Sequence, residues 1–477
     1  MKIRTMAFLF CAFFFSVSVS AQTLNFSQKV NPLIQTYTPH AQVGIVLLDP
    51  KTNQILFQKN AHQLFTPASN VKLFTASAAL LGLGLNYRYE TILGYQQNQL
   101  KHHVLNGNVY LYFSGDPSLE IKDLDKLIYS LKKNGVEKIQ GNIILDDSYF
   151  SKPDHPLGIS FEDLNWYYAA PITSIIVNEN KITAFLHPSK KIGNPVSVEL
   201  GEGMAYLHLS SHIKTVSCSD AEHHCSLLLE INDKNQINLN GCWPMEGTYS
   251  EVDFAVKNPF LFASAVISES LQKNKIIFKG KFLKGIMPTV SKKINHYSKP
   301  LPDLIQTMLK RSDNLYAEAM TKTLGKKYFN HGTIQEGVNA IEMILSKEWG
   351  IQFGKNSSIK LFDGEGTRYD LVSPYALANL LQHIYQNKKL YPIILNSLPH
   401  SHVDDDSTFT HFLSFKLLPA NVYAKTGTFN DTSALSGYIK TKKRQWLIFS
   451  IMVNHEGHSL KSARDLQTKL GETFAVL

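Results

Sequence analysis

Long apolar runs are scarce in this chain. After residue 21, no stretch approaches the ~20 consecutive apolar residues that a membrane-spanning helix needs. The first 21 residues follow a different pattern: Lys2 and Arg4 form a short basic start, an apolar core covers 6–15, and small residues occupy Val19–Ala21. This pattern predicts that residues 1–21 are a signal peptide cleaved on export, with an uncleaved anchor as the alternative. We therefore expect an exported chain with no membrane anchor after cleavage.

Cysteine is also rare. Of four cysteines in 477 residues, three follow the predicted signal peptide: Cys218, Cys225 and Cys242. Export permits a disulfide, and three candidates leave one thiol over. Cys218 and Cys225 would close a short loop, and Cys242 could replace either of them. A zinc site that uses the adjacent His223 and His224 would lack a fourth ligand at the usual spacing, so we expect neither a metal nor another cofactor.

The chain has no dense cluster of one charge. Lys and Arg number 48 against 39 Asp and Glu, and this excess of +9 is spread along the sequence without a basic run. Proteins that bind nucleic acid usually concentrate their cations, so we do not expect nucleic acid as a partner. A mild basic balance would suit an anionic polymer of the cell envelope.

The apolar pattern divides the chain into two kinds of segment. Residues 22–86 and 291–477 combine amphipathic helices with a hairpin near the N-terminus and further strands near the C-terminus. Residues 87–290 consist mostly of strand-like runs, one of which covers 172–186. We therefore predict an α+β fold. The outer segments would form one discontinuous domain of helices against an antiparallel sheet, and 87–290 a β-rich insertion of one or two nested subdomains.

A serine and a lysine, Ser69 and Lys72, lie at the start of an apolar stretch of helical periodicity from Val71 to Leu83. Residues three apart share one face of a helix, so the two side chains would be neighbours. Burial lowers the pKa of a lysine, and a neutral amine beside the hydroxyl can take its proton. The pair is therefore a candidate nucleophile and base. The same spacing recurs elsewhere in the chain, where a capping serine and a solvated lysine are the simpler interpretation.

Two further motifs follow in order. Ser312-Asp313-Asn314 lies in a predicted break between helices, and Lys425-Thr426-Gly427 lies at the end of a predicted strand. Each alone would be an ordinary cap or turn. Together, Ser-x-x-Lys, Ser-x-Asn and Lys-Thr-Gly in this order are the signature of penicillin-binding proteins and class A β-lactamases.

Acyl transfer gives a role to the polar residues of these motifs. Ser69 would attack and Lys72 would accept its proton. Ser312 with Lys425 would supply a proton to the leaving amine. Asn314 would hold Lys72 and the substrate backbone.

The Lys-Thr-Gly strand would bind the substrate. Lys425, with the hydroxyls of Thr426 and Thr428 beside it, would bind a substrate carboxylate. Gly427 would let the substrate or the nucleophile helix approach the strand closely. The backbone N–H groups of Ser69 and Thr428 would form the oxyanion hole.

On these motifs, the chain resembles the low-molecular-mass class C penicillin-binding proteins, the serine D-alanyl-D-alanine carboxypeptidases and endopeptidases of the S13 peptidase family. The long interval between Lys72 and Ser312 is similar to that family's large two-domain insertion, whereas class A β-lactamases have a far shorter interval. The segments 115–119 (GDPSL), 141–146 (GNIILD) and 170–171 (AP) also resemble the family.

The resemblance implies a penicillin-binding, serine β-lactamase-like core, an acyl-enzyme without a metal, and cleavage of peptidoglycan stem peptides and cross-links. It implies β-lactams as inhibitors and a location in the Gram-negative periplasm. It leaves the oligomeric state open, a homodimer included.

Some members of the family bind diaminopimelate through an acid on the insertion and a base near the core. Asp163 matches the position of the acid, with Tyr168 where an aromatic residue is usual, and Arg368 matches the base. Asn430 lies where a polar residue follows Lys-Thr-Gly. The simpler interpretation of Asp163 is a solvated turn carboxylate.

One loop departs from the family. At 363–368 the chain reads DGEGTR, where the family usually has a DGSGLSR-like stretch. Glu365 therefore replaces a serine, and the loop is one residue shorter, which affects the expected placement of Arg368.

Two other functions compete with a D,D-peptidase. A serine β-lactamase would need a group that activates the deacylating water, either a glutamate in a loop before Lys-Thr-Gly or a tyrosine in place of Ser312. The third possibility is a non-catalytic wall-binding or β-lactam-sensing protein, and the presence of all the acylation residues argues against it.

Overall fold

The computed structural model describes residues 26–201, 204, 207–220, 225–246, 249–401, 407–408, 421–457 and 460–477, so the predicted signal peptide lies outside the described residues. These residues form two compact units. The first contains the chain up to Gly84, Ile305–Asp313 and Val338–Leu477, and the second contains Leu85–Leu304 and Asn314–Gly337. No helix in the described part of the chain is both long enough and apolar enough to span a bilayer.

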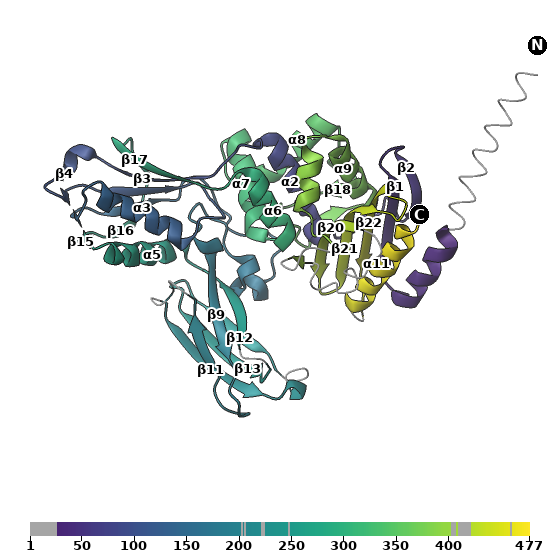
Figure 1. Cartoon of the computed structure of the whole chain (residues 1–477), viewed down its shortest axis with the longest axis horizontal. Coiled ribbons are helices and arrows are strands. Elements are labelled where there is room, and N and C mark those ends of the chain that lie inside the picture. Colours follow the sequence, from purple (N-terminus) through teal and green to yellow (C-terminus); the bar gives the residue numbers. More distant parts are fainter. Residues whose placement is uncertain are drawn as a thin grey trace, which may run out of the picture. The chain divides into compact units, whose positions relative to one another are not determined.

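A five-stranded antiparallel sheet forms the centre of the first unit (Figure 1). Its middle strands are buried along nearly their whole length, as expected for strands covered on both faces. The predicted N-terminal hairpin is its edge pair, joined to the C-terminal strands through β1 and β22. In sheet order the strands are β2 Gln54–Lys59, β1 Gln42–Asp49, β22 Trp446–Asn454, β21 Thr432–Lys440 and β20 Asn421–Phe429.

Helices cover both faces of this sheet. On one face, a helix at 26–37 and the C-terminal α11 (Leu460–Ala475) bury apolar side chains such as Val30, Leu470 and Phe474 against the strands. On the other face, α9 (Pro374–Gln386) packs on β1 and β22. The first unit also contains α2 Lys72–Gly82 and α10 Leu390–Ser397. The unit boundaries fall within α6 Leu301–Arg311, within α8 Ile334–Trp349, and just before α7 Asn314–Phe329, which belongs to the second unit.

The second unit begins with two small sheets and two helices. In α3 (Ile121–Lys133), Leu124, Leu127, Ile128 and Leu131 are buried at helical spacing, and α3 packs on α5 (Pro259–Lys273). One sheet consists of β16 Phe282–Lys284, β8 Ile143–Asp146, β6 Val109–Phe113, β3 Glu90–Tyr95 and β17 Lys292–Tyr297. The other consists of β15 Ile277–Phe278, β7 Lys138–Ile139, β5 Val104–Leu105 and β4 Leu100–Lys101.

Two three-stranded sheets complete the second unit, and their inward residues join the same apolar core as α3 and α5. One consists of β10 Ser197–Leu200, β9 Lys181–His187 and β14 Ser250–Ala255; the other of β11 Leu209–Val216, β13 Ile237–Pro244 and β12 Leu227–Ile231. Cys225 and Cys242 form a disulfide that joins β13 to the residues before β12, and Cys218 is not in a disulfide. The prediction of one continuous strand over 172–186 is wrong in its first half. Residues 172–177 are irregular because their backbone groups bond to loops, as Ile172 N–H does to Asp154 O.

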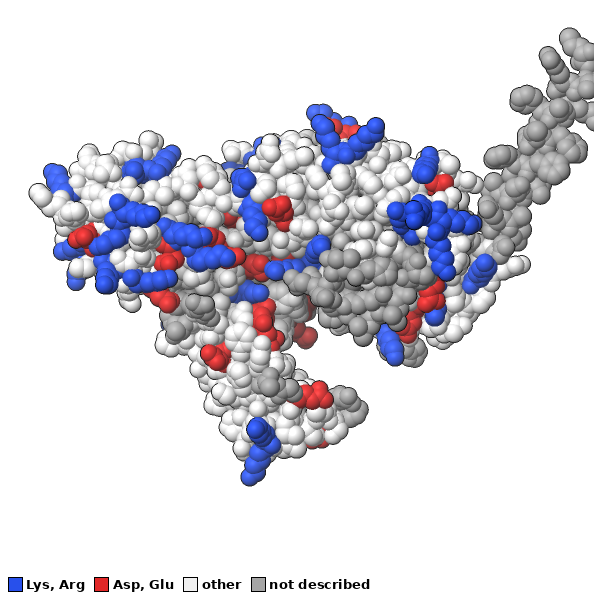
Figure 2. Space-filling view, in the orientation of Figure 1, with Lys and Arg blue, Asp and Glu red and all other residues white. Residues whose placement is uncertain are grey.

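Charged side chains of both signs are interspersed on the surface, as expected from a sequence without a run of one charge. On the face shown in Figure 2, Lys and Arg alternate with Asp and Glu. Some of these charges pair, for example Lys273 with Asp125 at 2.8 Å and Lys284 with Asp147 at 2.6 Å.

One lysine of the second unit is fully buried. Lys322 of α7 has no exposed surface, and its ammonium donates hydrogen bonds to the carbonyls of Pro153 and Ile172, each at 2.8 Å. Burial lowers the pKa of Lys322 to about 8, although the carboxylates of Asp154 and Glu318 act in the opposite direction. The folded protein therefore loses this proton before the unfolded chain does.

This difference predicts that stability rises with pH in the alkaline range. Between the folded pKa of about 8 and the ordinary pKa near 10.5, the unfolded chain binds more protons at Lys322 than the folded chain. Relative to pH 7, the Lys322→Met variant should therefore lack a gain of about 1 kcal/mol that the parent protein acquires by pH 9. Urea unfolding of both proteins at the two pH values measures this difference. An identical pH dependence would show that the proton on Lys322 is not lost in this range.

Candidate active site

Ser69 lies on a tight turn that leads into α2, and Lys72 is the first residue of that helix. The turn is a 3-10 helix, η1 (Ala68–Val71), so the predicted helical stretch begins one turn earlier as 3-10 and becomes α-helical at Lys72. Lys72 is fully buried, and its Nζ lies 2.9 Å from Ser69 Oγ and 2.7 Å from the backbone oxygen of Glu365. The carbonyl orients the amine toward the serine. This geometry allows the Ser69 proton to pass to the Lys72 amine whenever that amine is unprotonated.

A second serine–lysine pair lies in the same unit. Lys425 Nζ of β20 donates to Ser312 Oγ at 2.8 Å and to the backbone oxygen of Thr426 at 2.8 Å. Ser312 follows α6 in the left-handed region, with φ of 60°, and joins α6 to α7. Burial, and then the positive charge of Lys72, holds the pKa of Lys425 well below its ordinary value. Two buried amines therefore affect each other's charge, and each lies within hydrogen-bond distance of a serine hydroxyl.

Two glycines allow backbone to pack directly on the nucleophile turn. A Cβ at Gly427 of β20 would lie 2.6 Å from the Pro67 carbonyl oxygen, and one at Gly366 would lie 2.1 Å from the Ala68 carbonyl oxygen. The Lys-Thr-Gly strand and the 363–368 loop therefore contact the same short turn. The prediction that Gly427 permits a close approach agrees with this packing. Thr426 donates to Thr408 at 2.8 Å, and Thr428 is exposed.

We expect Gly427→Ala to slow acylation. The added methyl group would collide with the backbone before Ser69, which must shift to accommodate it. A displacement of this kind should lower the second-order acylation rate constant of a penicillin about tenfold or more, as stopped-flow labelling would measure. Gly457→Ala is the matched control, because a Cβ there meets no atom of the described residues within 4 Å. Equal rates for the two variants would contradict the steric argument.

The 363–368 loop supports the nucleophile turn through backbone atoms. It lies between β18 (Ile359–Lys360) and β19 (Leu371–Val372), and the Asp363 carboxylate accepts hydrogen bonds from the N–H groups of Glu365, Gly366 and Thr367. Its carbonyls accept hydrogen bonds from Lys72 and Thr75. Sequence reasoning missed this role, because backbone acceptors leave no signal in side-chain type. The only available signal was the departure of this loop from the family pattern.

Arg368 lies at the end of this loop. It is exposed, and its guanidinium lies 5.1 Å from the centre of the Phe429 ring, next to Thr428 in the sequence. The shorter loop therefore still places Arg368 beside the end of β20. The predicted diaminopimelate base is thus found in the first unit with the two serine–lysine pairs.

Asn314, Tyr168 and Asp163 belong to the second unit and are connected to one another. Asn314, the first residue of α7, donates to the backbone oxygen of Tyr168 at 2.9 Å, and the Tyr168 hydroxyl donates to Asp163 Oδ1 at 2.8 Å. Burial, followed by the Asp163 carboxylate, raises the pKa of Tyr168, so its hydroxyl stays protonated. Sequence reasoning named these three residues but not the contacts between them.

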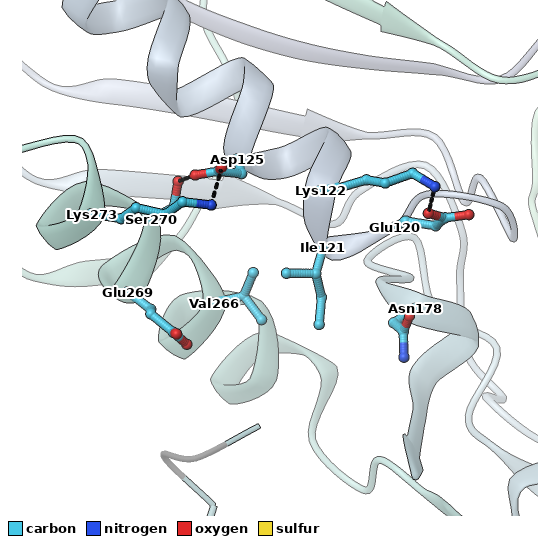
Figure 3. Close-up of a pocket in the computed structure, with 9 residues that line it drawn as sticks. All are labelled: Glu120, Ile121, Lys122, Asp125, Asn178, Val266, Glu269, Ser270 and Lys273. Carbon is cyan, nitrogen blue, oxygen red and sulfur yellow. Dashed lines mark hydrogen bonds and ion pairs between the residues drawn. The ribbon is translucent and has the colours of Figure 1, made fainter. Parts of the chain in front are cut away.

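A pocket of about 390 Å³ in the second unit contains none of the predicted site residues. It lies between α3 and α5 and is lined by Glu120, Lys122, Asp125, Glu269, Lys273 and their neighbours (Figure 3). Several of its charges are already paired within the protein, as Lys122 is with Glu120 and Lys273 with Asp125. No group of three His, Cys, Asp or Glu that could hold a metal occurs among the described residues, which do not include His223 and His224.

Known proteins are similar to this chain over nearly its whole length. The family model of the D-Ala-D-Ala carboxypeptidase 3 (S13) family matches residues 26–473. A D-alanyl-D-alanine carboxypeptidase, DacB, from Haemophilus influenzae is 30% identical over 472 residues, which are 98% of this chain and 95% of that protein. A crystal structure of penicillin binding protein 4 (dacB) from the same organism superposes with a TM-score of 0.83 at 29% identity, over 94% of this chain and 99% of that one. Another structure of that protein, in complex with a β-lactam, gives a TM-score of 0.77 at 26% identity, over 94% of this chain and all of that one. With its α+β fold and both serine–lysine pairs, this chain belongs to the D-Ala-D-Ala carboxypeptidase 3 (S13) family.

Proposed function

We propose that this protein is a serine D-alanyl-D-alanine carboxypeptidase with D,D-endopeptidase activity, which acts on peptidoglycan stem peptides and cross-links and is acylated by β-lactams. The observation that carries the proposal is the pair of short contacts in the first unit, 2.9 Å from Lys72 Nζ to Ser69 Oγ and 2.8 Å from Lys425 Nζ to Ser312 Oγ. They supply a nucleophile with its base and a second hydroxyl with a proton source. Export to the periplasm, by cleavage of residues 1–21, belongs to the same proposal.

The proposed reaction proceeds in two steps. Ser69 Oγ attacks the carbonyl of the penultimate D-alanine while its proton passes to the neutral Lys72 amine. The leaving amine of the terminal residue takes a proton from Ser312, which Lys425 can resupply, and an ester to Ser69 remains. Water then hydrolyses this ester: its hydroxyl bonds to the acyl carbon, its proton returns to Ser69 Oγ, and the proton that Lys72 took up passes to Lys425, which restores both amines. Backbone N–H groups of Ser69 and Thr428 stabilise the oxyanion in both steps.

Substrate binding is proposed to use the C-terminal half of β20. Lys425, Thr426 and Thr428 bind the terminal carboxylate of the substrate, and Gly427 leaves room for its backbone. Asn314, two residues after Ser312 in the chain, is proposed to hold the substrate amide. A β-lactam has a carboxylate and a strained amide, which correspond to the terminal carboxylate and the cleaved amide of the peptide substrate. This correspondence explains why a β-lactam would acylate Ser69.

One experiment tests the proposed function. The purified mature protein is incubated with a fluorescent penicillin and, separately, with a peptide that ends in D-Ala-D-Ala. Stable label on the peptide that contains Ser69, together with release of D-alanine, is the expected result. Rapid release of hydrolysed penicillin would indicate a β-lactamase instead, and label without D-alanine release would indicate a sensor.

Asp163 and Arg368 are proposed to bind the amine and carboxylate of diaminopimelate in the stem peptide. We therefore expect Asp163→Asn to raise KM for a diaminopimelate-containing pentapeptide about tenfold, because a charged hydrogen bond is lost. The rate of acylation by penicillin, which lacks diaminopimelate, should stay within twofold (about the scatter of such assays). Glu162→Gln is the matched control, since it removes the neighbouring carboxylate of the same 3-10 turn. A KM that Glu162→Gln raises as much as Asp163→Asn would refute the assignment.

A further inference from the structure

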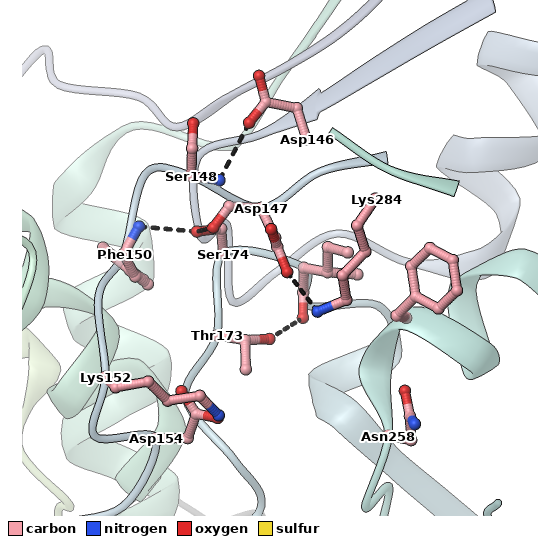
Figure 4. A network of polar contacts seen from close by, with 12 residues as sticks. Asp146, Asp147, Ser148, Phe150, Lys152, Asp154, Thr173, Ser174, Asn258 and Lys284 are labelled. Atoms are coloured by element: carbon pink, nitrogen blue, oxygen red, sulfur yellow. Dashed lines mark hydrogen bonds and ion pairs between the residues drawn. The ribbon is translucent and has the colours of Figure 1, made fainter. Parts of the chain in front are cut away.

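The residues between 153 and 172 form a long loop that carries Asp163 and Tyr168. We call it the 153–172 segment. Its two ends lie side by side, because Ile172 N–H donates to Asp154 O at 2.8 Å. The chain around it is fixed by Ser174, whose hydroxyl accepts from Phe150 N–H and donates to Asp147 O, each at 2.7 Å (Figure 4).

Lys322 provides a second, buried link between the two ends of the same loop. Its ammonium donates to Pro153 O and Ile172 O, each at 2.8 Å, and therefore joins the first and last residues of the 153–172 segment. It lies 5.5 Å from the centre of the Phe150 ring and has no exposed surface. A buried ammonium is costly to desolvate, so a lysine at this place needs an explanation beyond filling space. None of the proposed catalytic steps uses it.

The helix that carries Lys322, α7, contacts the 153–172 segment at its first residue and from Tyr168 to its last residue. Asn314 and Lys322 are eight residues apart in α7 and so lie on one face. Asn314 donates to Tyr168 O, and between them Leu315 and Ala319 pack in an apolar cluster with Ala170 and Ile172. Helix α7 therefore holds the segment at Tyr168 and at the place where its two ends meet, which we call the base of the segment.

We propose that Lys322 is a positioning residue for substrate recognition, which closes the base of the 153–172 segment so that the Asp163 carboxylate is presented to the diaminopimelate of the substrate. This inference rests on the proposed role of Asp163. Tyr168 transmits the effect, because its backbone oxygen is held by Asn314 and its hydroxyl donates to Asp163. Lys322 itself does not touch the substrate.

The experiment compares Lys322→Met with Lys326→Met. Methionine has nearly the same length as lysine but cannot donate a hydrogen bond. Lys326 lies one turn further along α7, and its amine donates to Asn330 O, outside the 153–172 segment. For Lys322→Met we expect a KM about tenfold higher for the diaminopimelate pentapeptide, with kcat and penicillin acylation within about twofold. Lys326→Met should match the parent protein.

A direct measurement of the loop accompanies the kinetics. Hydrogen exchange of the Ile172 and Trp166 amides should become about tenfold faster or more in Lys322→Met, because the loop opens more often once its base is released. Lys322→Arg, which keeps charge and donors, should restore KM to within about threefold of the parent value. A residue needed only for packing would be rescued better by methionine than by the larger arginine. If Lys322→Met does not fold, Lys322→Gln is compared in the same way.

The outcomes separate this inference from the proposed function. If Asp163→Asn raises KM but Lys322→Met changes neither KM nor hydrogen exchange, Lys322 is not a positioning residue. If Asp163→Asn leaves KM unchanged while the parent enzyme still releases D-alanine, diaminopimelate is not bound by Asp163, and the present inference fails with it. Additive effects of Asp163→Asn and Lys322→Met on KM would also overturn the inference, because residues that act through one contact are not additive.

Discussion

Ser69→Ala is expected to abolish covalent labelling by a fluorescent penicillin and to lower kcat/KM for D-alanine release by about a thousandfold or more. The hydroxyl is the only group lost, and its oxygen is the proposed acyl acceptor. The surrounding contacts should persist, since Lys72 keeps its hydrogen bond to the Glu365 carbonyl and α2 keeps its buried apolar face. Peptide mass mapping after labelling and a D-alanine release assay measure the two effects.

Ser77→Ala is the control for this experiment. Ser77 lies two turns further along α2, where its hydroxyl donates to the Leu73 carbonyl at 2.7 Å, so its loss removes a buried hydroxyl of the same helix without touching the candidate site. Labelling of Ser77→Ala should equal that of the parent protein. Persistent label in folded Ser69→Ala, or its loss in both variants, would contradict the assignment of Ser69 as nucleophile.

Lys72→Met is expected to have the next largest effect, a loss of about a thousandfold in the rate of acylation. Methionine fills a similar volume but cannot accept the Ser69 proton, so a neutral hydroxyl would have to attack. The change also removes one of two buried amines, which should raise the pKa of Lys425, because the charge of Lys72 contributes to its depression. Stopped-flow acylation between pH 6 and pH 10 measures the rate and its pH dependence.

Lys360→Met provides the matched control for Lys72→Met. Lys360 follows Ser357 with the same Ser-x-x-Lys spacing but is exposed on β18. Its loss should leave acylation unchanged, which would show that burial and position, not spacing, make the base. If Lys72→Met kept acylation within about tenfold of the parent rate, another group would have to serve as the base, and Lys425 would be the first to examine.

Local patterns in the sequence were sufficient to predict much of the first unit. The turn residues at Asp49–Asn53 predicted the hairpin of β1 and β2, and the apolar spacing after Val71 predicted α2. Both signals arise from residues close together in the chain, which is where turn chemistry and helical periodicity act. The strand prediction for 172–186 failed in its first half because an apolar segment can be buried without pairing as a strand. Ile172 and Ile176 are buried in a cluster with Leu315 and Ala319 of α7, and Ile175 and Val177 in the core that contains α3 and α5.

The candidate site shows the same distinction. The short interval from Ser69 to Lys72 made their contact predictable, and the order of the three motifs indicated Ser312 and Lys425 as partners although they are 113 residues apart. The carbonyl of Glu365, by contrast, could not be named in advance. Any residue has a carbonyl, so side-chain chemistry does not mark the one that orients Lys72.

The amino-acid sequence by itself determined the family and the α+β class, because these depend on side-chain type, order and local periodicity, and the reacting groups remain a prediction from it. The domain limits at 22–86, 87–290 and 291–477 and the signal peptide remain predictions from it. Only the tertiary structure decided that Cys225 pairs with Cys242 and that Lys322 joins the two ends of the 153–172 segment. It also decided that Asn314, Tyr168 and Asp163 are connected in series. The physical reason is that a hydrogen bond depends on the distance and direction between atoms, and residues far apart in the chain acquire these only when packing brings their elements together.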